Sequence, residues 1–268
     1  MGSFGVVGAS GDGVGEGDGA GGVDDRRRAL AKLTLTLRIT GVRSDGFHLL
    51  DSEMVTIDLA DELEFAPGDN LEVVPDWAQA GRRSDGDEPW GMPEDDSNLI
   101  RRALKLVGRS ASVRLRKRIP VGGGLGGGSA DAAAVLRWAG VDDLSVAASL
   151  GADVPFCLVG GRARVRGIGE VVEPLSFESR SFTLLTPPLF VSTPAVYRAW
   201  DEMGGPVGDG PNDLEAAALV VEPGLAEWRD RLGAMTGETP ILAGSGSTWY
   251  VRGSFEGPGL VRCRTEQP

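Results

Sequence analysis

The chain has 268 residues, enough for one large or two modest domains with a substantial core. Its 39 Asp and Glu residues against 27 Lys and Arg residues give a formal net charge of −12, which disfavours general binding to nucleic acid or to an anionic membrane. The two cysteines, Cys157 and Cys263, lack metal-ligand spacing, so we expect two packed, reduced thiols. No apolar run is long enough for a membrane span and the N-terminus lacks a secretory signal core, so we expect a cytoplasmic protein.

The first stretch, residues 1–23, alternates glycine with small or acidic residues and buries too little surface to offset the entropy of ordering it. The charged run 24–28 that follows has the composition of a solvated domain edge. We therefore predict a disordered, glycine-rich tail over residues 1–28.

Residues 31–39 form the first predicted strand, because apolar and polar residues alternate strictly along them. Leucine or isoleucine occupies positions 33, 35, 37 and 39, while Lys32 and Thr34 lie on the opposite, polar face. The pattern predicts a half-buried strand and, taken alone, makes Lys32 a solvent-facing charge.

A predicted turn at 43–46 delivers Phe47 and the only histidine of the chain, His48, to the start of the next strand. Taken alone, a single histidine beside a turn is usually a surface polar residue.

The segment from 53 to 107 predicts strands first and then a helix. Residues 53–65 have the pattern of two strands around Ala60-Asp61, and residues 71–74 that of a third, short one. The hydrophilic residues 76–96 are predicted to form a surface loop. From residue 99 to 107 apolar residues recur at helical spacing, which predicts a core-facing helix.

The stretch 118–131 contains six glycines interrupted by one leucine, a density that packing alone does not explain. Glycine accepts positive φ and lets a ligand approach the backbone, so successive N–H groups can turn toward one anion. Ser129 is a predicted N-cap, and the apolar residues after it predict a helix that ends at Gly140 with its positive end toward the same anion. The sequence therefore predicts a phosphate-binding loop.

Two well-known phosphate loops do not match this stretch. A Walker loop requires Lys-Ser or Lys-Thr at its end, and Gly128-Ser129-Ala130 has no lysine. A run of glycines matches the dinucleotide pattern G-x-G-x-x-G trivially, but residues 113–116 alternate like a half-exposed strand, whereas a Rossmann strand is buried on both faces. A flexible glycine turn without a ligand is the structural alternative.

The rest of the chain predicts short helices and strands. Helices are predicted at 144–150, from Thr193, from Asn212 and over 225–235, and strands at 162–166, 182–185 and 241–243. Asp153 is unusual among these elements, because it directly precedes the apolar run 154–156, where a solvated aspartate is less expected.

Residues 120–130 resemble the central motif of the GHMP small-molecule kinases, and three further blocks, 31–48, 150–156 and 243–247, agree with that superfamily. The resemblance runs from about Ala31 to about Val251. Its best agreement is with the branch that phosphorylates the 2-hydroxyl of a diphosphocytidyl sugar alcohol in non-mevalonate isoprenoid synthesis.

This resemblance implies roles for particular residues. Lys32 matches the lysine beside the reacting hydroxyl, and Asp153 matches the catalytic aspartate. ATP and Mg²⁺ are the implied cofactors, with Ser129 the only candidate for a metal ligand. The turn Gly244-Ser245-Gly246 would support the phosphate region. The implied ATP-binding residues are Pro120, Val121, Gly122, Gly123, Gly124, Leu125, Gly126, Gly127, Gly128, Ser129 and Ala130.

The same resemblance implies a site for the cytosine of the substrate. Phe47 and Tyr197 would stack on its two faces, and His48 would hydrogen-bond its edge. The chain departs from the family pattern in two places: Phe47 replaces the commoner tyrosine, and Thr34 stands where an asparagine is usual. Stacking requires only a π-face, so we expect Phe47 to be tolerated.

The fold implied by the resemblance is α+β with two domains and an active site between them. Residues 29–175 would form an N-terminal ribosomal-protein-S5-like domain, and residues 176–268 a shortened, ferredoxin-like α/β C-terminal domain. The partner would be a small molecule rather than nucleic acid or membrane, and the protein a monomer or weak homodimer.

Two alternatives stay open at this point. One is another GHMP kinase acting on a sugar, homoserine or mevalonate, against which the three residues of the predicted cytosine site argue. The other is a degenerate nucleotide-binding protein without turnover, suggested by Thr34, the shortened C-terminal part and the long glycine tail, and opposed by the presence of both Lys32 and Asp153.

Overall fold

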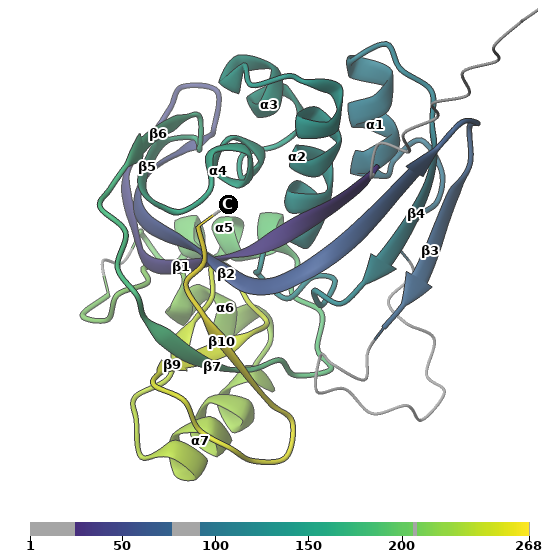
Figure 1. Cartoon of the computed structure of the whole chain (residues 1–268). Helices are drawn as coiled ribbons and strands as arrows, with labels where there is room; N and C mark the ends of the chain where they lie inside the picture. The colour runs from purple at the N-terminus through teal and green to yellow at the C-terminus, as the bar shows by residue number, and fades with distance from the viewer. Residues whose placement is uncertain (1–24, 77–91, 206–207, 268) are drawn as a thin grey trace, which may run out of the picture.

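The computed structural model describes residues 25–76, 92–205 and 208–267. In these residues two β-sheets and their helices form a mixed α+β architecture, as predicted (Figure 1). The predicted tail falls almost entirely on residues 1–24, and most of the predicted loop 76–96 falls on 77–91, so both lie outside the described residues. None of the described helices is long and apolar enough to cross a membrane.

The larger sheet has six strands, and its two longest run side by side. β1 (Arg26–Val42) pairs antiparallel with β2 (His48–Ala66), whose two halves pair with β4 (Ser112–Lys117) and β5 (Arg162–Gly167). The edges are β3 (Leu71–Pro75), parallel to β4, and β6 (Val171–Pro174), antiparallel to β5. Val113 and Leu115 of β4 are buried while Arg114 and Arg116 are exposed, as the alternation predicts.

Four helices gather on one side of this sheet (Figure 1): α1 (Leu99–Leu106), α2 (Gly127–Ala139), α3 (Leu144–Leu150) and α4 (Val154–Val159). α2 is the central one, because three consecutive alanines, 132–134, let it pack closely against β1, α1 and α4. It ends at Gly140, whose φ of 75° is left-handed, as predicted.

The smaller sheet has the order β10-β7-β9-β8. Its strands are β7 (Ser181–Leu185), β8 (Ile241–Leu242), β9 (Trp249–Arg252) and β10 (Leu260–Arg264). Three helices accompany it: α5 (Thr193–Glu202), α6 (Glu215–Val221) and α7 (Leu225–Thr236). A second apolar core, which includes Trp200 and Trp249, lies among these elements.

β1 belongs to both halves of the molecule. Leu33 and Leu35 lie in the core beneath α2, whereas Leu37 and Ile39 lie in the second core. The backbone N–H of Leu37 donates to Pro211 O at 2.8 Å, and its carbonyl accepts from Asp213 N at 3.0 Å. One strand therefore fixes the two halves relative to each other, and Lys32 lies where they meet.

The structure differs from the sequence prediction at both ends of the β1–β2 pair. β1 begins at Arg26, because residues 26–28 pair with residues 62–64 of β2 instead of belonging to the tail. Residues 53–65 form part of one strand rather than two. The break predicted at Asp61 is absent because its buried carboxylate accepts the backbone N–H groups of Arg118 and Ile119, at 2.6 and 2.8 Å.

Both cysteines are free and buried, as expected. Burial raises the pKa of the Cys157 thiol to about 12, which keeps this thiol protonated at neutral pH.

Candidate active site

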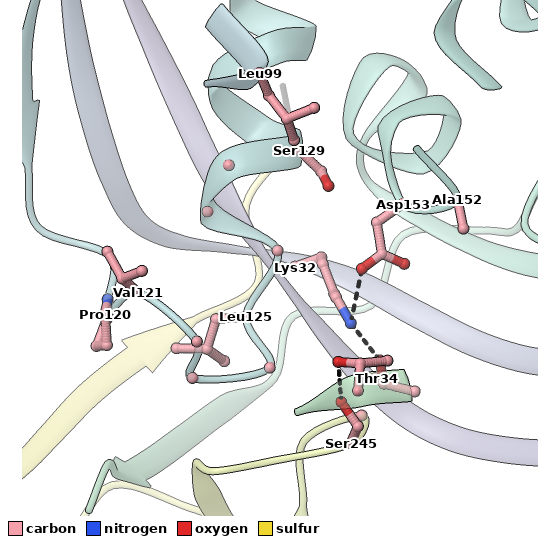
Figure 2. A pocket seen from close by; sticks show the side chains of 18 of the residues that line it. Lys32, Thr34, Leu99, Pro120, Val121, Leu125, Ser129, Ala152, Asp153 and Ser245 are labelled. Carbon is pink, nitrogen blue, oxygen red and sulfur yellow. Dashed lines mark hydrogen bonds and ion pairs between the residues drawn. The ribbon is translucent and has the colours of Figure 1, made fainter. Parts of the chain in front are cut away.

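A cavity of about 520 Å³ lies where the two halves meet. The glycine loop forms one wall, and β1 with Ala152 and Asp153 forms another (Figure 2). Residues of α5 and of the turn before β9 also line the cavity. Every predicted loop residue from Pro120 to Ser129 lines it, whereas Ala130 is buried in α2. The predicted residues from outside the loop that also line it are Lys32, Asp153, Tyr197, Gly244 and Ser245.

Lys32 points into this cavity although the strand pattern alone makes it solvent-facing. It is only 5% exposed, because the glycine loop covers the polar face of β1. The backbone N–H of Lys32 donates to Leu125 O at 3.0 Å, and a Cβ at Gly126 would lie 2.7 Å from Lys32 Cγ. The loop can therefore pass over the lysine stem only where it carries glycine.

Lys32 and Asp153 form an ion pair inside the cavity (Figure 2). Lys32 Nζ lies 3.3 Å from Asp153 Oδ2 and donates to Thr34 Oγ1 at 3.1 Å. The Asp153 side chain is one-third exposed, so its carboxylate faces the open part of the cavity. A carboxylate there can accept a proton from an alcohol, and the ammonium beside it can stabilise an oxyanion. Thr34 holds the ammonium through its hydroxyl.

The glycine loop turns its backbone toward the cavity by left-handed conformations. Gly122, Gly124 and Gly126 have φ values of 69°, 75° and 68°, which L side chains rarely adopt. α2 begins at Gly127, so the predicted N-cap at Ser129 is wrong: Ser129 lies in the first turn, and Gly126 occupies the cap position. The first N–H groups of a helix have no intrahelical acceptor and carry the positive end of its dipole. This end of α2 suits an anion.

The turn 243–248 supports the loop from behind. Ser247 N donates to Gly122 O at 3.3 Å, and Thr248 N donates to Gly123 O at 3.2 Å. Gly124 lies against the same turn, because a Cβ there would be 2.1 Å from the carbonyl oxygen of Ala243. Gly246 O is also close to that position, at 2.9 Å, so Gly246 contacts the loop without lining the cavity.

We expect Gly124→Ala to cost clearly more stability than Gly140→Ala, although both glycines have φ of +75°. No atom of the described residues lies within 4 Å of a Cβ at Gly140, so that variant measures conformational strain alone, about 1–2 kcal/mol. At Gly124 the new methyl must push the loop off the supporting turn. Urea denaturation measures both losses, and the KM for ATP should rise in Gly124→Ala only; equal losses would contradict this reading of the loop.

The three residues of the predicted cytosine site do not lie equally close to the cavity. Tyr197 lines it, and the His48 ring packs against Tyr197 with centroids 4.7 Å apart. Phe47 is 57% exposed, because it ends the turn before β2. The structure thus brings His48 and Tyr197 together and leaves a face of Phe47 open to solvent.

Sequence reasoning missed a buried ion cluster beneath the glycine loop. Lys117 Nζ contacts Asp61 Oδ2 and lies 3.1 Å from Asp131 Oδ2, and all three side chains are at most 1% exposed. A signal for it existed, because Lys117 follows Val113 and Leu115 at a spacing of two and so belongs to the buried face of β4. Asp201, which contacts His48, gave no such signal.

The chain is similar to known proteins over the elements that form this site. Residues 98–161, which include the glycine loop and Asp153, match the family model for the GHMP kinases N terminal domain. The 4-diphosphocytidyl-2-C-methyl-D-erythritol kinase of Paracoccus denitrificans is 39% identical, over 84% of this chain and 85% of that protein. The protein of the same name from Cereibacter sphaeroides is 36% identical, over 83% and 87%.

Solved structures agree with this. A crystal structure of 4-(cytidine 5'-diphospho)-2C-methyl-D-erythritol kinase is 34% identical and superposes with a TM-score of 0.63, covering 84% of this chain and 88% of that one. The mevalonate kinase of Methanococcus jannaschii shares the fold with a TM-score of 0.55 at 11% identity, covering 92% and 99%.

Proposed function

Because this chain belongs to the family of 4-diphosphocytidyl-2-C-methyl-D-erythritol kinases, we propose that it transfers the γ-phosphoryl group of ATP to the 2-hydroxyl of 4-diphosphocytidyl-2-C-methyl-D-erythritol. This reaction belongs to the non-mevalonate route to isoprenoid precursors. The observation that carries the proposal is the Lys32–Asp153 pair, which faces the glycine loop across one cavity.

In the proposed mechanism, Asp153 orients the attacking hydroxyl and receives its proton. The hydroxyl oxygen forms a bond to the γ-phosphorus, the bond from that phosphorus to the oxygen bridging to the β-phosphate breaks, and ADP leaves. Lys32 stabilises negative charge on the attacking oxygen and on the transferred group. Thr34 holds the Lys32 ammonium beside Asp153, at 3.1 Å.

The phosphates of ATP would lie on the N–H groups of residues 122–129, at the positive end of α2. Among the described residues there is no group of three His, Cys, Asp or Glu that could hold a metal ion. If a Mg²⁺ ion accompanies the nucleotide, the Ser129 hydroxyl, which lines the cavity, is the protein group that would hold it. Such an ion would supply positive charge that offsets the negative charge on the phosphates.

The direct test is a coupled ADP-release assay with the cytidyl substrate and with galactose, homoserine and mevalonate as competing alcohols. We expect turnover with the cytidyl substrate only, and loss of that turnover in Asp153→Asn. Turnover with another alcohol would identify a different GHMP kinase. No turnover with any of them would favour the nucleotide-binding protein without activity.

We expect Phe47→Ala to raise the KM for the cytidyl substrate by roughly five- to a hundredfold, because stacking on an aromatic side chain is worth about 1–3 kcal/mol per base. The KM for ATP should stay nearly unchanged. Phe177→Ala is the matched control, since Phe177 is another exposed phenylalanine, 41% exposed, in the segment between β6 and β7 rather than next to His48. A defect on the ATP side in Phe47→Ala would mean that the base lies elsewhere.

A further inference from the structure

One helix holds the only histidine of the chain on three sides. Tyr197, Trp200 and Asp201 occupy positions i, i+3 and i+4 of α5, so they share a helix face. The His48 ring lies 4.7 Å from the Tyr197 ring and 5.5 Å from the Trp200 ring, which meets it edge-on. His48 Nε2 lies 2.8 Å from Asp201 Oδ1. The orientation of the imidazole is therefore fixed from the other half of the molecule.

The contact with Asp201 also determines which ring nitrogen carries the proton. An ionised carboxylate can only accept hydrogen bonds, so His48 Nε2 must be the donor in this pair. In a neutral imidazole the other nitrogen is then an acceptor. His48 Nδ1 is thus available to accept a hydrogen bond from a ligand.

His48 does not itself line the active-site cavity, but two of its neighbours do. Successive residues of a strand point to opposite faces, so His48 shares a face of β2 with Leu50, which lines the cavity. Tyr197, against which the imidazole packs, lines it as well. A base held beside Tyr197 would therefore lie next to the imidazole.

We propose that Asp201 is a positioning residue for base specificity: it keeps the proton on His48 Nε2, so that Nδ1 accepts a hydrogen bond from the exocyclic amino group of cytosine. This inference rests on the proposed function. Uracil carries a carbonyl oxygen where cytosine carries the amino group. His48 Nδ1 and that oxygen are both acceptors, so they cannot form a hydrogen bond with each other. The carboxylate of Asp201 thereby favours a cytidyl substrate over a uridyl one without touching either.

The first experiment needs no substrate, because His48 is the only histidine and one labelled imidazole gives the whole signal. We expect the ¹⁵N spectrum of the wild-type protein at alkaline pH to show one tautomer, with the proton on Nε2. In Asp201→Asn the amide can donate or accept, so the two nitrogen shifts should move toward each other. Glu202→Gln, which changes the next exposed carboxylate of α5, is the matched control and should leave the spectrum unchanged.

The second experiment compares kcat/KM for the cytidyl substrate and its uridyl analogue. We expect the cytidyl-to-uridyl ratio to fall at least about fivefold in Asp201→Asn, the effect of one neutral hydrogen bond, and to stay at the wild-type value in Glu202→Gln. Asp201→Glu, which keeps the carboxylate at a half-exposed site, should retain a higher ratio than Asp201→Asn.

The outcomes separate this inference from the proposed function. Wild-type turnover with an unchanged ratio in Asp201→Asn overturns the positioning role, and so does an unchanged imidazole spectrum in that variant. If the wild-type protein phosphorylates neither substrate, the proposed function fails, and the proposed discrimination between cytosine and uracil fails with it. The spectrum then decides separately whether Asp201 fixes the tautomer of His48.

Discussion

We expect Asp153→Asn to lower kcat by at least about a hundredfold, the low end for loss of a positioned general base, with little change in stability. The asparagine fills the same space but cannot take a proton from the hydroxyl. Lys32→Met should cause a loss of similar size, because it removes the ammonium 3.3 Å from Asp153 while keeping most of the apolar stem under the glycine loop.

Two controls make these expectations specific. Lys105→Met removes another lysine, one that is exposed on α1 and outside the cavity, and should leave kcat unchanged. Urea midpoints of both variants should stay near that of the wild-type protein. In Lys32→Met the one-third exposed Asp153 can be hydrated, and in Asp153→Asn the amide oxygen and the Thr34 hydroxyl can still accept from Lys32. Near-normal turnover in either variant would remove that residue from the proposed mechanism.

Local patterns predicted the elements that carry this chemistry. Strict alternation from residue 31 to 39 predicted the middle of β1, and the glycine-rich stretch followed by alanines predicted the loop and α2. The alternation also separated Lys32 and Thr34 from the leucines. It could not show what covers the polar face, because the covering loop is about 90 residues away in the chain and is held by tertiary contacts.

The errors have the same origin. Aspartate is depleted in strands, so the pattern broke β2 at Asp61, whose partners lie near residue 118. Ser129 has the chemistry of an N-cap, but left-handed Gly126 starts the helix three residues earlier. The pairing of His48 with Asp201 joins a residue of β2 to a residue of α5 that lies 153 positions later in the chain, and no local pattern encodes it.

The second large effect concerns the buried cluster beneath the glycine loop. The Asp61 carboxylate accepts hydrogen bonds from Lys117 Nζ and from two backbone N–H groups, so its negative charge is well compensated. Among the described residues, Asp131 accepts a hydrogen bond only from Lys117, through Oδ2, and its Oδ1 has no hydrogen-bond partner. Burial raises the pKa of Asp131 to about 8, assisted by the nearby Asp61 and opposed by Lys117. Burial therefore favours the neutral form of Asp131 within this cluster.

A raised pKa has a definite sign in the stability of the protein. Folded Asp131 binds a proton between its unfolded pKa of about 3.9 and its folded pKa of about 8, where the unfolded chain does not. Its contribution to the free energy of unfolding is therefore fully present below about pH 4 and declines as pH rises through 8. Asp131→Asn imitates the protonated acid, so this variant should show a shallower loss of stability from about pH 5 to about pH 8 than the wild-type protein.

We expect Lys117→Met to lower the free energy of unfolding by about 3–5 kcal/mol at neutral pH, because it leaves the buried Asp61 carboxylate without its cation. Asp131→Asn is the matched control: it changes another member of the same cluster but keeps the Lys117–Asp61 pair, so its loss should stay within about 1 kcal/mol. Lys117 Nζ would lie 2.7 Å from a Cβ at Gly127, so the ammonium packs directly beneath the start of α2. Lys117→Met should therefore also raise the KM for ATP. Urea denaturation of both variants decides the matter, since equal losses would mean that the cluster is not organised around the charge of Lys117.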